Sequence, residues 1–193
     1  MGSSANSNAV CSTQFRWARV GVPYQGDLST ARPQRGSLFE LLYILIWFLG
    51  LAGVTHAADL PPRPSEYFND LDSLVKKSTA QQLDRELADF EHQTSTQLIV
   101  VIYPKLPSGG SIGQYAVQLV HAWKLDQRGA VFLVDDQNHL LRIQAGSALK
   151  GKLSEAKCKQ IFIGVIMPRF KADDFDGGMK AGVAAVIAAV STK

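Results

Sequence analysis

An unbroken apolar run, Leu41–Val54, separates an N-terminal segment from the rest of this chain. At about 1.5 Å per residue, a helix over this run spans about 20 Å, short of a hydrocarbon core of about 30 Å. That length is typical of the h-region of a signal peptide, and the run lacks the polar face that a core helix would show. Thr55 and Ala57 are small residues at positions −3 and −1 of a cleavage site, which predicts a mature chain starting at Ala58. An uncleaved membrane anchor is the alternative.

The run sets the boundaries of the other segments. Residues 1–40, rich in Ser, Gly, Arg and Gln, are interpreted as a disordered leader or the product of a start site placed too far upstream. Residues 41–57 hold the h-region and the cleavage site, and residues 58–66 form a proline-rich linker, since proline enters neither helices nor central strands. The folded domain is expected over residues 67–193, enough for one core. We expect export to the periplasm or cell envelope, with membrane contact only through the N-terminal segment if it stays uncleaved.

Charge and cysteine content exclude several classes of protein. The net charge is +3, of which residues 1–57 supply +4 − 2 = +2, so the remainder is close to neutral at +1. A nucleic-acid-binding domain would need a basic stripe, and none is visible. Cys11 lies in the segment expected to be removed, which predicts that Cys158 is a free, half-buried thiol. No cysteine and histidine spacing suggests a zinc site.

Hydrophobic periodicity predicts the elements of the domain. Capping-box patterns at Ser78–Gln81 and Ser111–Gln114 begin two amphipathic helices. A third helix begins at Ser154 and ends at Pro168, and Asp173 or Asp174 caps a fourth. The expected strands are 97–103, apolar on both faces, and a hairpin of 130–134 with 140–144. This order predicts an α/β fold, a three-layer α/β/α sandwich on a small mixed sheet, preceded by a signal or anchor segment.

The domain resembles the TPM domain family, known from thylakoid-lumen phosphatase-like proteins and bacterial envelope proteins. The resemblance runs from Tyr67 to Val190 and rests on the order of many short motifs. These are Asn69-Asp70, which would open the first helix, Gln97 to Val101, Ser111-Ile112, Tyr115-Ala116, Trp123, Gly129, Arg142-Ile143, Gly146, Leu149, Gly151, Leu153-Ser154, Ile166 to Phe170, Asp174-Phe175, Gly178 and Gly182.

The resemblance implies the same α/β/α fold and a place beyond a membrane. It also implies either binding of divalent cations such as calcium with metal-assisted acid phosphatase activity, or a role in assembly and repair. This chain departs from the family where its chemistry would lie. The Trp123–Gly129 loop is short and lacks the family's Asp-Asn pair, Gly146-Ser147-Ala148 replaces a Gly-aromatic-Gly motif, and the third helix lacks an inward acid near Ile161–Gly164.

The candidate metal ligands are therefore Asp70 and Asp126, which together supply too few anionic oxygens for tight calcium or magnesium binding. Asp70 could instead cap a turn, and Asp135-Asp136 reads as a hairpin turn more readily than as part of the ligand set.

Three other side chains are candidates for phosphate chemistry. His121 could act as a general base, although no carboxylate partner is evident at helical spacing, which favours a surface histidine. Arg142 could grip phosphate or pair across strands, and Arg128 has no assigned position.

Two functions remain open, and the sequence does not decide whether the chain is an enzyme. One is a non-catalytic binding or assembly and repair module at the cell envelope, with an envelope or membrane protein as partner and no nucleic acid. The other is a weak acid phosphatase dependent on a divalent metal. The shortened loop favours the first. The only cofactor expected is a weakly bound calcium or magnesium ion.

Overall fold

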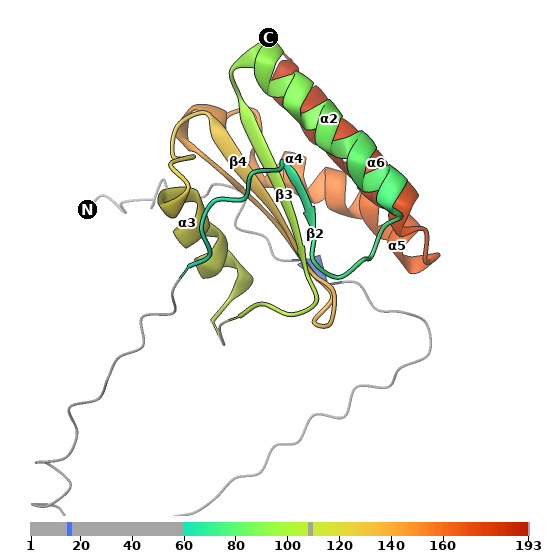
Figure 1. Cartoon of the computed structure of the whole chain (residues 1–193). Coiled ribbons are helices and arrows are strands. Elements are labelled where there is room, and N and C mark those ends of the chain that lie inside the picture. Colours follow the sequence, from blue (N-terminus) through green and yellow to red (C-terminus); the bar gives the residue numbers. More distant parts are fainter. Residues whose placement is uncertain (1–14, 17–59, 108–109, 193) are drawn as a thin grey trace, which may run out of the picture. The chain divides into compact units, whose positions relative to one another are not determined.

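The computed structural model describes residues 15–16, 60–107 and 110–192. The predicted signal segment at 41–57 and its predicted cleavage site lie outside the described residues, as do residues 1–40 apart from residues 15–16. Figure 1 shows the arrangement of the elements. In chain order they are β1 (Phe15–Arg16), β2 (Phe68–Asp70), α2 (Lys77–Thr94), β3 (Gln97–Tyr103), α3 (Ile112–Ala122), β4 (Gly129–Asp135), β5 (Leu140–Ala145), η1 (Ser147–Leu149), α4 (Glu155–Ile161), η2 (Phe162–Ile166), α5 (Met167–Lys171) and α6 (Phe175–Ser191).

The sheet is mixed, in the order β1-β5-β4-β3-β2. Strands β2, β3 and β4 are parallel, whereas β5 runs antiparallel to β4, and β1 runs antiparallel to β5. The β4–β5 hairpin and the central position of the apolar strand 97–103 are as the sequence predicted.

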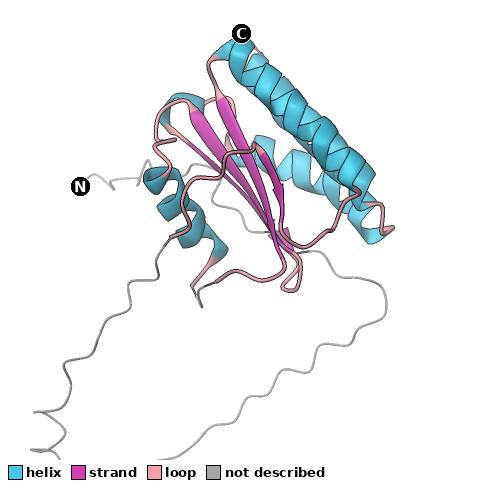
Figure 2. Ribbon diagram, in the orientation of Figure 1, coloured by secondary structure: helices cyan, strands magenta, loops and turns pink. Residues whose placement is uncertain are grey.

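Both faces of the sheet are covered, because β3 directs apolar side chains to each side. Leu98, Val100 and Ile102 lie in a core cluster with residues of α2, α4, η2, α5 and α6. Ile99, Val101 and Tyr103 lie in a second cluster with α3. Figure 2 shows the helices on the two sides of the sheet. The predicted three-layer α/β/α sandwich is confirmed.

The two parallel connections have opposite hands. The steps from β2 to β3 and from β3 to β4 move in the same direction across the sheet. The connecting helices lie on opposite faces, since α2 packs in the first cluster and α3 in the second. Two crossover connections that step in the same direction and have the same handedness place their helices on the same face of the sheet. Here the helices lie on opposite faces, so one of the two connections is left-handed, which is rare.

Strand β2 corrects the expectation that Asn69-Asp70 opens the first helix. Phe68 pairs with Val100 and Asp70 with Ile102, so these residues form a short edge strand. A strand of three residues is too short to show a period, and its partner lies far along the chain. The first helix begins only at Lys77.

Helix starts were predicted with mixed success. Ser111, Ser154 and Asp174 each accept the expected hydrogen bond from the backbone three residues later. The capping box at Ser78 is wrong, because α2 begins at Lys77 and its N-cap, Lys76, makes no side-chain cap bond. Instead, the carboxylate of Asp176 in α6 accepts from the Lys76 N–H at 3.1 Å.

The third helix does not end at Pro168. After Ile161 it passes into a π-helical turn, Phe162–Ile166, and then continues as α5. Pro168 lies in the first turn of α5. Helix α5 follows directly on the π-helical turn, so the helical segment passes the proline rather than ending at it.

The expectation of a free Cys158 is wrong. The side chain is fully buried and disulfide-bonded. The sequence has one other cysteine, Cys11, which lies outside the described residues. The expectation assumed that the N-terminal segment, and Cys11 with it, is removed. The full chain contains Cys11.

The linker lies against the α3 side of the domain. Leu60 packs on the second core cluster, and Trp123 Nε1 donates to the Pro61 carbonyl at 3.0 Å. Within the described ranges, no helix is both long and apolar enough to cross a membrane.

Candidate functional site

The carboxyl ends of the parallel strands are the first place to look for a site, since ligands of open α/β sheets bind there. Asp70 ends β2, Tyr103 ends β3 and Asp135 ends β4. Each of these side chains has a hydrogen-bonding partner in the structure, which gives it a structural role.

Asp70 holds the loop that follows it. Its Oδ1 accepts from the N–H groups of Asp72 and Leu74, both at 3.1 Å, and its Oδ2 accepts from Val75 at 2.9 Å. Both oxygens therefore bind the backbone of residues 72–75. The structure gives Asp70 the turn-capping role that the sequence offered as its alternative.

Asp84 plays a similar part on α2, where it shares a hollow of about 450 Å³ with Asp70 and Glu66. Asp84 Oδ1 accepts from the N–H groups of Tyr67 and Phe68 at 2.7 and 3.1 Å. This carboxylate fixes the start of β2 against α2, so two of the acids that border the hollow, Asp70 and Asp84, already bind backbone N–H groups.

Asp135 holds the hairpin turn, as the sequence favoured. It is 1% exposed, and its two oxygens accept from the N–H and the side-chain amide of Asn138 at 3.1 and 2.9 Å. The Asp136 N–H donates to the Tyr103 carbonyl at 3.0 Å, which ties the turn to β3.

His121 and Asp126 come together at the other end of the sheet. The His121 Nδ1 contacts the Asp126 carboxylate, and the two side chains are 70% and 43% exposed. The sequence shows no carboxylate for His121 at helical spacing, because Asp126 lies in the loop after α3 rather than on it. A left-handed residue at Lys124 (φ 59°) turns the chain back toward the helix.

The two candidate metal ligands do not meet. Asp70 pairs with Ile102, whereas Asp126 lies just before Gly129, which pairs with Gln97. At about 3.3 Å per residue, Gln97 and Ile102 lie about 16 Å apart along β3. Among the described residues, no group of three or more His, Cys, Asp or Glu side chains is placed to hold a metal ion. Asp70 and Asp126 therefore do not fit one calcium or magnesium site.

The two arginines have structural partners. Arg142 is 5% exposed on β5, and its Nη2 donates to Gln144 Oε1 at 2.7 Å. Its buried Nε has no acceptor among the residues that the structure describes. Burial lowers the pKa of Arg142, against the opposing effect of nearby Glu155. Arg128 Nη2 donates to the Thr94 carbonyl at 3.0 Å, where a cation suits the end of helix α2.

The structure shows two tyrosine clusters that the sequence analysis missed. Tyr103 and Tyr115 meet edge to face in the core, with hydroxyls 3.4 Å apart. Burial, reinforced by Tyr115, raises the pKa of Tyr103 far above its ordinary value. The contact between these two hydroxyls could not be predicted from the sequence, because it depends on the packing of α3 against β3 in the folded domain.

The second cluster joins Tyr67, Glu91 and Gln97. Hydrogen bonding to Glu91 and burial raise the pKa of Tyr67. Burial acts to raise the pKa of Glu91, but hydrogen bonds from Tyr67 and Gln97 outweigh it and hold that pKa below its ordinary value. The cluster ties α2 to the start of β3 and to the segment before β2.

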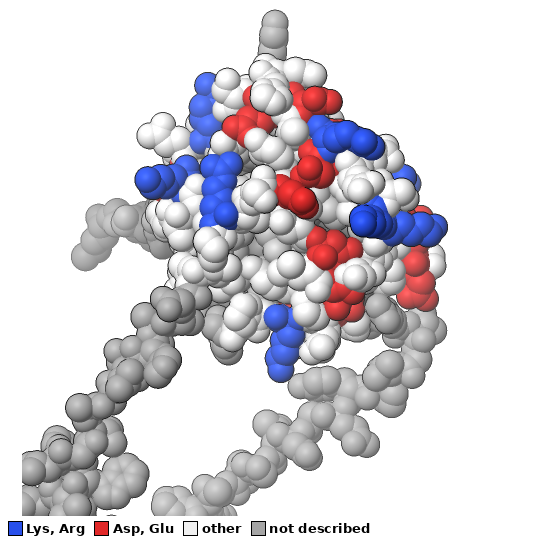
Figure 3. All heavy atoms as spheres, in the orientation of Figure 1, with Lys and Arg blue, Asp and Glu red and all other residues white. Residues whose placement is uncertain are grey.

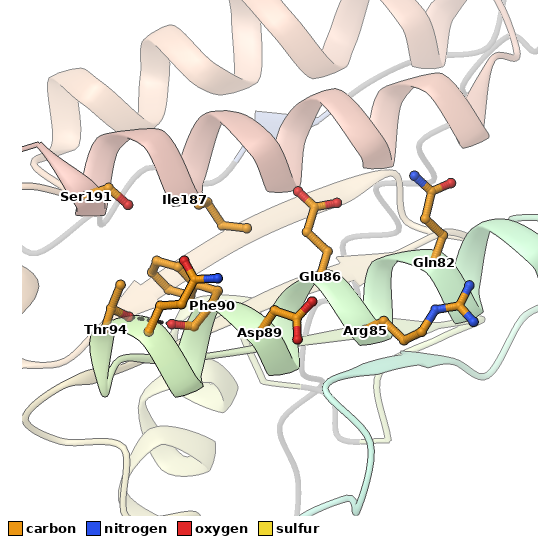
Figure 4. Close-up of a pocket in the computed structure, with 9 residues that line it drawn as sticks. Gln82, Arg85, Glu86, Asp89, Phe90, Thr94, Ile187 and Ser191 are labelled. Carbon is orange, nitrogen blue, oxygen red and sulfur yellow. Dashed lines mark hydrogen bonds between the residues drawn. The ribbon is translucent and has the colours of Figure 1, made fainter.

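A hollow of about 520 Å³ lies between α2 and α6. Figure 4 shows Glu86 of α2 pointing toward α6, from which Ile187 projects, while Arg85 extends away from Ile187. Figure 3 shows acidic and basic side chains interspersed over the described residues of this face. The charged residues have the i, i+3 and i, i+4 spacing of an ordinary solvated helix face, which gives no reason to assign chemistry here.

Comparison with known proteins identifies the domain. The family model of the TPM domain matches residues 68–189. The chain belongs to the TPM domain family. The match spans β2 to α6, and the comparison with curated proteins gives no match.

Three solved structures share the TPM fold. The N-terminal domain of a protein from P. gingivalis has 20% identity and a TM-score of 0.57, covering 63% of this chain and 79% of its own. The N-terminal domain of the cg2496 protein from Corynebacterium glutamicum has 13% identity and a TM-score of 0.52, with coverages of 70% and 88%. The BA42 protein from Bizionia argentinensis has 17% identity and a TM-score of 0.51, with coverages of 63% and 84%. These similarities establish the fold alone.

The short loop of this TPM domain is held by Gly146. A Cβ at this position would lie 2.5 Å from the Leu125 carbonyl oxygen and 2.6 Å from that of Gln127. The Ser147 and Ala148 N–H groups donate to the Asp126 and Gln127 carbonyls at 2.7 and 3.1 Å. The loop therefore rests directly on the chain that follows β5, and this contact positions Asp126.

Proposed function

We propose that this TPM domain protein is exported and acts as a non-catalytic binding or assembly and repair module at the cell envelope, with an envelope or membrane protein as its partner. The observation that carries the proposal is the use of its carboxylates. Both carboxylate oxygens of Asp70 accept hydrogen bonds from backbone N–H groups, and Asp70 lies at the opposite end of the parallel strands from Asp126. Phosphomonoester hydrolysis needs cationic groups and a nucleophile converging on one phosphoryl group.

A second candidate, a weak divalent-metal-dependent acid phosphatase, is supported by one observation. The exposed His121 imidazole contacts the Asp126 carboxylate, an arrangement that orients a histidine for proton transfer. The two arginines considered for phosphate binding have other partners, because Arg128 donates to the Thr94 carbonyl and Arg142 to Gln144.

Hydrolysis of a generic aryl phosphate at acidic pH separates the two functions. The full chain is assayed with and without added calcium or magnesium, beside His121→Gln and Asp126→Asn. Arg85→Gln serves as the control, since Arg85 lies on the α2 face away from this pair. We expect turnover near background in all four proteins. Turnover well above background that is lost in His121→Gln and Asp126→Asn, and kept in Arg85→Gln, would establish the phosphatase instead.

Export is tested separately, by fractionation of cells followed by N-terminal sequencing. The proposal expects the protein in the envelope fraction. A first residue of Ala58 would show cleavage, a first residue upstream of Leu41 would show an anchor or an intact leader, and a purely cytoplasmic protein would contradict the proposal.

A further inference from the structure

Strand β2 lies at one end of the described sheet and has a single neighbour there, β3. The Tyr67 carbonyl and the Leu71 N–H both hydrogen-bond to β3. Successive residues of a strand direct their backbone groups to opposite sides, so those of Phe68 and Asp70 point away from β3. The Phe68 N–H donates to Asp84, whereas the Phe68 carbonyl and the Asp70 N–H pair with no residue in the described part of the chain. An edge with such groups is a template for pairing with another strand.

The hollow of about 450 Å³ described above lies beside this edge. Phe68 and Asp70 line it from β2, and Ala80 and Asp84 line it from the first half of α2. The loop that joins β2 to α2 borders it as well (Figure 1). Exposed sheet edges are where PDZ and PTB domains add an extended peptide as a further strand. The β2 edge therefore offers both backbone groups for pairing and space for the side chains of an added strand.

The hollow has an excess of acidic side chains. Glu66, Asp70 and Asp84 line it, against one basic residue, Lys77. Asp84 accepts from two backbone N–H groups through Oδ1 alone. A carboxylate has about four acceptor sites, so Asp84 Oδ2 is available to a cation. This charge complements a partner segment that carries lysine or arginine.

The opposite side of the β2 edge carries an exposed apolar residue. Asn69 pairs with Val101, whose side chain lies in the second core cluster, so Asn69 faces the α3 side of the sheet. Leu71, two residues later, faces the same side and is 60% exposed. An added strand directs alternate side chains to the two faces, so one set would meet the acids of the hollow and the other set would meet Leu71.

We propose that the β2 edge binds an extended segment of the partner protein as an additional strand, and that this segment alternates basic and apolar residues. The basic side chains enter the hollow beside Glu66 and Asp84, and the apolar ones cover Leu71. The inference rests on the binding role in the proposed function, because it states which surface binds the partner and what chemistry the bound segment has. It does not depend on export.

The first test measures binding of a peptide of alternating lysine and valine, about eight residues long and blocked at both ends, to the full chain by fluorescence anisotropy. We expect micromolar affinity, and affinity weaker by about tenfold or more when glutamate replaces lysine. Peptides N-methylated at every lysine or at every valine lack the donors of one strand side, so one of the two should lose binding. Equal affinity of the unmodified and both methylated peptides would show ionic attachment without strand pairing and would overturn the proposal.

The second test locates the bound peptide by amide exchange in the full chain. With saturating peptide we expect the Asp70 N–H to exchange about tenfold more slowly, because it gains a carbonyl acceptor. The Leu71 N–H already bonds to β3 and serves as the internal reference. Unchanged exchange of the Asp70 N–H in the bound state would exclude strand addition at β2.

The third test changes the charge of the hollow. Glu66→Gln/Asp84→Asn removes two charges and keeps an oxygen acceptor at position 84 for the Tyr67 and Phe68 N–H groups. We expect this variant to bind the peptide about fivefold more weakly. The matched variant Glu86→Gln/Asp89→Asn makes the same chemical change in the hollow between α2 and α6 and should bind like the parent chain. Equal loss in both variants would show an effect of net charge alone and would contradict a site at β2.

Failure of these tests is distinct from failure of the proposed function. A chain that fails to bind the peptide but is exported and lacks phosphatase activity keeps its binding role and loses only the β2 site. A chain that hydrolyses aryl phosphate through His121 and Asp126 loses the proposed function whatever the peptide does.

Discussion

Replacing Gly146 by alanine should destabilise this protein far more than its small size suggests. The new Cβ would lie 2.5 Å from the Leu125 carbonyl oxygen, 2.6 Å from the Gln127 carbonyl oxygen and 2.7 Å from the Asp126 carbonyl carbon. All three are backbone atoms, so no side-chain rotation relieves the overlap. The backbone φ of Gly146 is −71°, which alanine adopts freely, so the cost comes from the contact and not from the dihedral angle.

The magnitude follows from the overlap and the hydrogen bonds around it. Overpacking costs about 1–3 kcal/mol. The loop can retreat only by weakening the bonds from Ser147 to Asp126 and from Ala148 to Gln127, each worth about 0.5–1.5 kcal/mol net. Loss of glycine freedom in the unfolded chain returns about 0.4–1 kcal/mol. We expect a net loss of about 2–4 kcal/mol in the free energy of unfolding.

Urea unfolding of the full chain, followed by far-UV circular dichroism, measures this loss. Gly151→Ala is the matched control, since a Cβ at Gly151 would meet no atom within 4 Å. It should leave the free energy of unfolding unchanged or raise it by up to about 1 kcal/mol. Equal midpoints for Gly146→Ala and Gly151→Ala would refute the close approach of the loop to the chain after β5.

Three further predictions follow from named contacts. The hydrogen bond from Thr79 lowers the pKa of Asp176 in the folded protein, although burial acts to raise it. The ionised carboxylate therefore stabilises the fold at pH values above its unfolded pKa, and this stabilisation is lost as the pH falls through the lower folded pKa. Asp176→Asn should therefore lose about 1 kcal/mol at pH 7 and show a flatter acid limb in urea unfolding, whereas exposed Asp89→Asn should match the parent. Trp123 is 4% exposed, so with the two other tryptophans replaced by phenylalanine the folded chain should emit at short wavelength and shift red in urea; a red-shifted native spectrum would contradict its packing. Calorimetry should give millimolar or weaker affinity for calcium and magnesium, about −4 kcal/mol, and a micromolar affinity would reveal a site that Asp70 and Asp126 do not explain.

The candidate site shows where sequence reasoning reaches its limit. The hairpin role of Asp135-Asp136 was readable because its partner, Asn138, lies in the same turn. The contact between His121 and Asp126 was not, because it depends on the left-handed turn after α3 and on the support of Gly146. The separation of Asp70 from Asp126 needed the strand register.

Local patterns by themselves determined most of the elements. Strand 97–103 is apolar on both faces, so it could only be a covered central strand, and Ser111 and Asp174 cap helices through bonds to residues three positions away. The tertiary structure decided what depends on distant partners. Strand β2 exists through its pairing with β3, and the start of α2 is capped by Asp176, a hundred residues later. These contacts leave no periodic trace in the sequence, because the energy that stabilises them arises only when the layers pack together.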